Sequence, residues 1–228
     1  MEQGGGQAHW IPLSDLMTGL MLVFMLIAAA FMLRVEQTTT LVVVEYEQTR
    51  KDMALALQEE FSQDLKQWNA EMLGDMTIRF KDPSLLFATG SAELKPDFKQ
   101  LLNDFFPRYA RLLHSEKFNS AVKEIRIEGH TSTFWNKGVD ERTAYFRNME
   151  LSQLRTRTTL EYLLSLETDP SRESWLRQRL TANGLSSSKP IRMTDGSIDE
   201  LASQRVEIRI VTNAEDRLKA IADKIADR

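Results

Sequence analysis

The chain has 228 residues and a formal net charge of −4. This charge gives no general attraction to nucleic acid, and no Lys/Arg stripe with interleaved aromatic residues is present, which argues against a nucleic-acid-binding protein. The complete absence of cysteine excludes disulfide frameworks, thiol nucleophiles and thiolate zinc sites, and the length suits one folded domain with an appendage.

The first predicted element is a transmembrane helix over residues 10–35. Between Ile11 and Leu33 only Asp15 is charged, and about 23 helical residues reach about 34 Å, enough for a bilayer core of about 30 Å. Residues 1–9 contain no Lys or Arg, unlike the start of a cleavable signal peptide, so we expect the segment to remain as an anchor. The nearest cations follow the span, so the positive-inside rule alone would place the rest of the chain in the cytoplasm.

Asp15 has two interpretations. Acids inside membrane helices are costly, at about 2.5–3.5 kcal/mol, and usually face protein or water in a functional role. If the helix began beside Asp15, the carboxylate would be an ordinary N-cap. If it began at Pro12, Asp15 would lie inside the first turns, where a carboxylate can exchange a bound ion. Thr18, one turn later, could assist with its hydroxyl or simply bond to its own backbone.

Residues 36–74 are predicted to form a helical stalk, because Leu41–Leu73 contain neither Gly nor Pro. Apolar residues recur there at intervals of three or four, which predicts one apolar stripe along a helix. The stripe consists of Ala54, Leu57, Phe61, Leu65, Trp68 and Met72. Two partners are possible for it: a second copy of the chain in a dimer, or the domain that follows.

Residues 75–213 have the pattern of a mixed domain with helices and strands. Alternating residues predict half-buried strands, and apolar residues at intervals of three or four predict helices. The predicted strands are 77–80, 122–128 and 205–211, and the predicted helices are 96–114, 152–166 and 174–182. Gly184 fits a helix end or turn. Residues 214–228 are predicted to form an amphipathic helical tail packed on the domain or its twin.

Five stretches of this domain resemble, in order, the signatures of the OmpA-like peptidoglycan-binding family. They are "LLFATGSAELKP" (85–96), "IRIEGHTS" (125–132), "NMELSQLRTRTTLEYLL" (148–164), "LTANGLSSSKPI" (180–191) and "SQRVEIRI" (203–210). The resemblance implies an α+β protein: a single transmembrane helix, a helical stalk and an OmpA-like α/β sandwich domain.

The membrane stretch "DLMTGLM" (15–21) resembles the D-x-M-T-x-x-M segment of MotB-type stator subunits, in which the Asp carries the translocated ion. Together the features most resemble the MotB-like subunits of Zorya anti-phage systems. This resemblance implies ion translocation by Asp15 with Thr18. It also implies a homodimer inside a ring of a MotA-like multi-span partner (ZorA), residues 1–9 in the cytoplasm, and a periplasmic domain attached to the bacterial inner membrane. A flagellar MotB-type subunit and a passive OmpA-like tether are the alternatives.

The same resemblance implies the wall-binding residues. In the family a loop Asp and a helix Arg hold the diaminopimelate of the peptidoglycan stem peptide, and Arg155 matches that Arg. Asn148 would offer its amide to the ligand, Leu151 would form an apolar floor, and Ser152 would cap the helix. Ser132 stands where the family has its acid.

Extra residues, among them Phe134, Trp135, Asp140 and Glu141, follow Ser132 before the Asn148 motif. Either the acids of this loop replace the missing one, or the domain binds a different stem peptide, or it binds weakly.

No enzyme, cofactor or metal site is predicted. His130 has no second His or Cys at metal-binding spacing, so we expect it to have a structural role. No Ser, His and acid arrangement and no Gly-rich phosphate loop is present in the sequence.

Overall fold

The computed structural model describes residues 10–81 and 83–213. Within them the chain divides into two compact units, residues 10–48 and residues 49–213. The predicted cytoplasmic tail (1–9) and C-terminal helical tail (214–228) lie outside the described residues.

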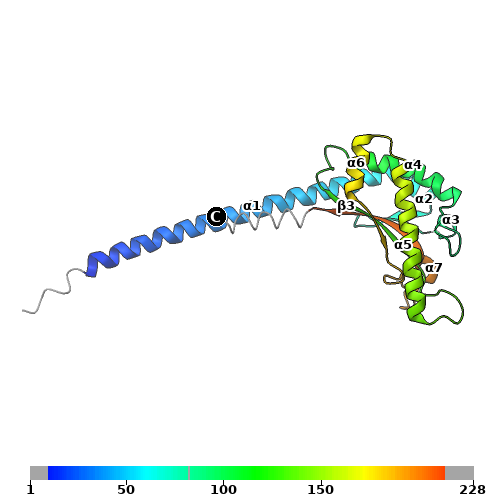
Figure 1. Ribbon diagram of the computed structural model, residues 1–228. Helices are drawn as coiled ribbons and strands as arrows, with labels where there is room; N and C mark the ends of the chain where they lie inside the picture. The colour runs from blue at the N-terminus through cyan, green and yellow to red at the C-terminus, as the bar shows by residue number, and fades with distance from the viewer. Residues whose placement is uncertain (1–9, 82, 214–228) are drawn as a thin grey trace, which may run out of the picture. The chain divides into compact units, whose positions relative to one another are not determined.

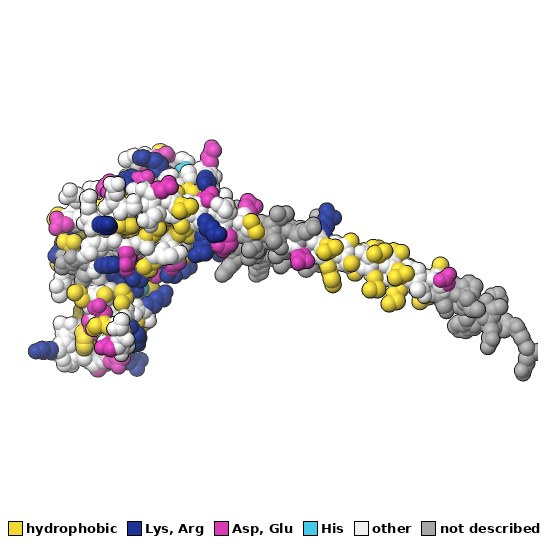
Figure 2. Space-filling model, turned by 180° about the vertical axis from the view of Figure 1, so that it is seen from behind, with side chains coloured by type: hydrophobic (Ala, Val, Ile, Leu, Met, Phe, Trp, Pro, Cys, Tyr) yellow, Lys and Arg dark blue, Asp and Glu magenta, His cyan; other side chains and the backbone are white. Residues whose placement is uncertain are grey.

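The first unit consists of the N-terminal part of α1 (Trp10–Phe61). The segment Asp15–Glu36 has a mean hydropathy of 2.5, and none of it is buried within the protein. Figure 2 shows hydrophobic side chains covering this stretch of the helix. A helix this long and this apolar can cross a membrane, which agrees with the predicted N-terminal span.

The second unit is built on a five-stranded sheet with the order β1-β2-β5-β3-β4 (Figure 1). The strands are β1 (Ala70–Met72), β2 (Ile78–Phe80), β3 (Val122–His130), β4 (Leu180–Gly184) and β5 (Arg205–Thr212). Only the pair β3 and β4 is parallel; β5 lies between β2 and β3 and is antiparallel to both. The segments predicted as strands therefore form the centre of the sheet.

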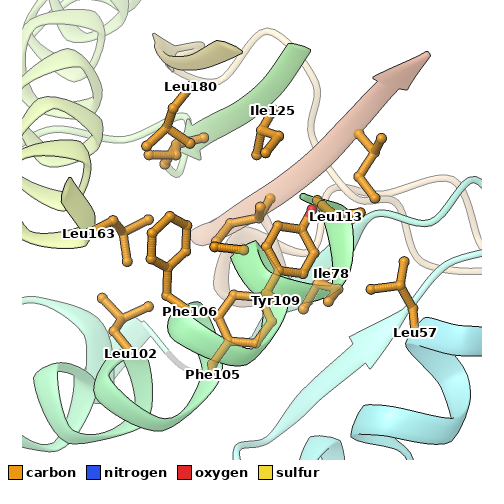
Figure 3. Close-up of a cluster of buried hydrophobic side chains, with 14 of the residues drawn as sticks. Leu57, Ile78, Leu102, Phe105, Phe106, Tyr109, Leu113, Ile125, Leu163 and Leu180 are labelled. Atoms are coloured by element: carbon orange, nitrogen blue, oxygen red, sulfur yellow. The ribbon is translucent and has the colours of Figure 1, made fainter. Parts of the chain in front are cut away.

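One face of the sheet is apolar and carries the core. Alternate residues of the strands, such as Ile78, Ile125 and Ile208, are buried on this face. The longer helices, α4 (Pro96–Leu113), α5 (Glu141–Ser165) and α6 (Pro170–Arg179), lie over it (Figure 1). Figure 3 shows Phe105 and Tyr109 of α4 in the middle of the core, with Phe106 beside Leu163 and Leu102 on one side and Leu57 of α1 on the other. This arrangement is the expected α/β sandwich.

The apolar stripe of residues 54–72 packs on this domain, which is the second of the two predicted alternatives. Leu57 and Phe61 are fully buried, and the rings of Phe61 and Phe105 lie 5.2 Å apart. The prediction of a helix up to Leu73 is wrong, because α1 ends at Phe61 and is followed by α2 (Asp64–Gln67) and β1. Pairing of β1 with β2 outweighs the local helix preference of these residues.

The helix predicted from Ser152 begins earlier, at Glu141. Its N-cap is Asp140, whose carboxylate accepts a hydrogen bond of 3.0 Å from the backbone N–H of Thr143. The predicted capping role of Ser152 is therefore wrong. Ser152 lies inside α5, and its hydroxyl accepts a hydrogen bond from the backbone N–H of Ser186.

The sequence also did not predict β4, since residues 180–182 were expected to continue a helix. Gly184 ends this strand rather than a helix. A Cβ atom at Gly184 would lie 2.3 Å from the backbone nitrogen of Gln153, so this glycine allows α5 to cross β4 closely. The remaining short helices are α3 (Pro83–Leu86) and α7 (Glu200–Ser203).

Candidate ligand-binding groove

A groove of about 570 Å³ lies where the loop after β3 meets α5. All four residues predicted to bind a ligand line it: Ser132, Asn148, Leu151 and Arg155. The last three share one side of α5, because positions three and four apart on a helix lie next to each other. The structure therefore brings the predicted residues together.

Among the described residues, Arg155 is held in place by a backbone carbonyl oxygen and an aromatic ring and has no acidic partner. Its Nε donates a hydrogen bond of 2.9 Å to the carbonyl oxygen of Ser91, and its guanidinium lies 4.8 Å from the centre of the Phe87 ring. In the described part of the chain no carboxylate oxygen lies within 4.0 Å of it. Burial lowers the pKa of this guanidinium, but arginine stays protonated in proteins. The groove thus offers an oriented positive charge with unused N–H donors.

Asn148, which was predicted to offer its amide to the ligand, uses its side-chain N–H groups to organise the loop. The side chain is buried, and Nδ2 donates to the carbonyl oxygens of Ser132 at 3.1 Å and Phe134 at 3.0 Å. These bonds use both donors of the amide. The Ser132 hydroxyl also donates to the carbonyl oxygen of Phe134, at 3.2 Å.

The acids of the extra segment are not directed at the ligand site. Asp140 caps α5, and Glu141 is exposed in the first turn of that helix. A residue that the sequence did not single out, Glu200 of α7, instead accepts hydrogen bonds from the backbone N–H of Thr133, at 2.8 Å, and from its hydroxyl. No sequence signal links these two residues, because 67 positions separate them.

His130 belongs to a buried charged cluster on the other face of the sheet. Its Nε2 lies 3.5 Å from a carboxylate oxygen of Glu207 and 3.8 Å from one of Glu128. The other carboxylate oxygen of Glu207 accepts hydrogen bonds of 2.7 Å from Arg79 and Arg205.

Burial lowers the pKa of His130. Burial of Glu207 opposes ionisation, but its contacts with His130 and the two guanidiniums hold the pKa of this carboxyl well below its usual range. Glu128, His130 and Glu207 are close enough to hold a metal ion. The two guanidiniums, however, already balance one carboxylate and would repel a divalent cation, so we interpret the group as an ion-pair cluster.

Asp15 and Thr18 lie in the first unit. The helix α1 begins at Trp10, so Asp15 is inside the helix and not at its start. The N-cap interpretation of Asp15 is therefore wrong. Asp15 is exposed, and Thr18 lies on the same side of the helix one turn later.

Comparisons with known proteins agree with this architecture. Residues 86–204 match the model of the OmpA family. The chain is 43% identical to the Zorya protein ZorB of Escherichia coli over 217 residues, which cover 93% of this chain and 92% of the relative.

Among solved structures, a putative MotB-like protein from Desulfovibrio vulgaris is similar, with a TM-score of 0.51 and 22% identity over 76% of this chain and 98% of that one. The cell wall anchor of the T6SS from Pseudomonas aeruginosa gives a TM-score of 0.46 and 22% identity over 68% of this chain and 96% of that one.

Proposed function

Because the chain belongs to the OmpA family and to the family of the Zorya protein ZorB, we propose that it is the cell-wall-anchored stator subunit of an ion-driven membrane motor in anti-phage defence. The relationship to ZorB favours defence over a flagellar role. The proposal divides the chain into a wall anchor, formed by the groove, and an ion carrier, formed by the membrane segment. It assigns no catalytic step to this chain.

The Arg155 guanidinium in the groove is the observation that carries the anchor half of the proposal. Because it has no carboxylate partner in the described structure, its remaining N–H groups can donate to the carboxylate of a peptidoglycan stem peptide in a charge-assisted, two-point contact. The guanidinium of Arg155 lies over the ring of Phe87, so the arginine side chain loses little conformational freedom on binding. Leu151 lines the same groove and would contact the apolar part of the peptide.

The ion-carrier half rests on Asp15. Asp15 is exposed and is the single charged residue between Ile11 and Leu33, and an acid inside an apolar helix needs protein or water around it in a membrane. One helix cannot form a pore, so the proposal places a homodimer of this chain inside a ring of a MotA-like multi-span partner (ZorA). Asp15, with the Thr18 hydroxyl, would then pass a proton or sodium ion along the interface. The N-terminus would be cytoplasmic and the groove periplasmic, where the wall is.

The experiment that tests the anchor half is co-sedimentation of the full chain, in detergent, with purified peptidoglycan. Arg155→Ala should weaken binding by at least about tenfold, the equivalent of about 1.5–3 kcal/mol for a charge-assisted bond. Arg157→Ala is the matched control, since Arg157 lies on the same helix, is 73% exposed at its side chain and pairs with Glu161. Unchanged sedimentation of the Arg155 variant would contradict the proposal.

A further inference from the structure

Two adjacent aromatic residues, Phe134 and Trp135, line the groove beside Arg155. Phe134 is 71% exposed, and Trp135 is half-buried. A single exposed aromatic residue needs no explanation, but two adjacent aromatic residues that line the same groove of mixed polar and apolar residues are a candidate binding surface. Neither residue contributes to the contact proposed for Arg155.

The loop that presents these rings is held from two directions. Asn148 of α5 bonds to the carbonyl oxygens of Ser132 and Phe134, and Glu200 of α7 holds both the backbone N–H and the hydroxyl of Thr133. These contacts within the protein thus hold the backbone of the loop in place without a ligand. Such preorganisation lowers the entropic cost of binding and lets rigid aromatic rings contribute contact area.

The groove is larger than an amino-acid recognition site requires. Its volume of about 570 Å³ falls in the range of about 300–1,000 Å³ that encloses a whole organic ligand of moderate size. Polar side chains, among them Thr89, Asn136 and Gln204, share its lining with the two aromatic residues. A ligand that fits must therefore offer an apolar face to the rings and hydrogen-bonding groups at its edge.

A sugar ring in its chair form has both features: a face of C–H bonds and a rim of hydroxyl and amide groups. A wholly apolar partner would instead leave the polar lining without hydrogen bonds, which is costly. We infer that Phe134 and Trp135 form a stacking platform for an amino sugar of the glycan strand, next to the peptide held by Arg155. This inference rests on the proposed function, because the sugar and the stem peptide are covalently joined parts of one polymer.

Calorimetric titration of the full chain in detergent with two probes tests the inference. One probe is the free stem tetrapeptide containing diaminopimelate, and the other is the same peptide on its disaccharide. The native chain should bind the disaccharide-peptide about tenfold more tightly, as expected for burial of an aromatic contact. The double variant Phe134→Ala/Trp135→Ala should bind both probes with the affinity of the native chain for the free peptide.

Phe146→Ala is the matched control, because Phe146 is an exposed aromatic residue of α5 outside the groove lining. It should retain the tenfold preference, and Trp135→Phe should retain most of it. Equal affinity of the native chain for both probes would overturn the inference but leave the proposed function standing. The inference would also be overturned if the double variant lost affinity for both probes by the same factor. Failure of the native chain to bind either probe would instead contradict the proposed function.

Discussion

The side-chain amide of Asn148 donates a hydrogen bond of 3.0 Å to the backbone carbonyl oxygen of Phe134, fourteen positions earlier in the chain. This contact joins the helix that carries Arg155 to the loop that carries the aromatic residues. One buried polar side chain therefore fixes the two walls of the groove relative to each other.

Asn148→Ala should release this loop. The substitution removes the donor to two carbonyl oxygens, and we expect a loss of about 1–3 kcal/mol in the free energy of unfolding. Amide hydrogen exchange of residues 133–136 should accelerate, while that of β3 stays slow. Asn136→Ala, a change in the same loop at an exposed residue, is the control. Unaltered exchange in the Asn148 variant would show that other contacts hold the loop.

The charged cluster around His130 predicts a pH dependence of stability. The pKa of His130 is lowered in the folded state, so the unfolded chain takes up a proton first as the pH falls through its ordinary value of about 6.5. The free energy of unfolding should therefore decrease between pH 7 and pH 5. A second decrease should follow below about pH 4.5, where the unfolded form of Glu207 takes up a proton.

Urea unfolding of the native chain, His130→Gln and His114→Gln at pH 7, 6 and 5 measures this dependence. The His130 variant should show a flatter response over this interval, because it cannot be protonated at that position. The His114 variant leaves the cluster intact and should keep the native response. An identical pH response in the native chain and the His130 variant would refute the assignment.

Local patterns in the sequence predicted the elements that are long or strongly periodic. In these elements the spacing of apolar residues recurs over enough positions to identify a helix or a strand. They are the apolar run after Asp15, the alternating strands 122–128 and 205–211, and the helix from Pro96. The family motif grouped Asn148, Leu151 and Arg155 as ligand-binding residues, although the predicted helix began only at Ser152. They share one face because α5 begins earlier, at Glu141.

The remaining features depend on contacts that are distant in the chain. The short strand β1 pairs with β2 at Glu71 and Arg79, and β4 is fixed by parallel pairing with β3. With three and five residues, β1 and β4 are too short for the spacing of their apolar residues to distinguish a strand from a helix. The contact of Glu200 with Thr133 and the approach of Glu207 to His130 likewise appear only once the sheet has assembled.

Orientation in the membrane gives a further prediction. The cations Arg34, Arg50 and Lys51 all follow the span, so the positive-inside rule alone places the domain in the cytoplasm. Wall binding requires the opposite, and large domains are translocated largely regardless of nearby charge. Alkaline phosphatase fused after Asn213 should therefore be active. Activity of a cytoplasmic reporter alone at this position would contradict wall binding.

Asp15→Asn distinguishes an ion carrier from a passive wall anchor, because the amide keeps the size and hydrogen-bonding capacity of the carboxylate but cannot be ionised. We expect cells producing this variant with its membrane partner to lose protection in a phage plating assay. Detergent pull-down of the partner should be unchanged, which controls for assembly. Asp15→Glu, which keeps the charge but displaces it by about one methylene, should give intermediate protection. Full protection by the Asn variant would contradict an ion-carrying role for Asp15 and leave the chain as a passive tether to the wall.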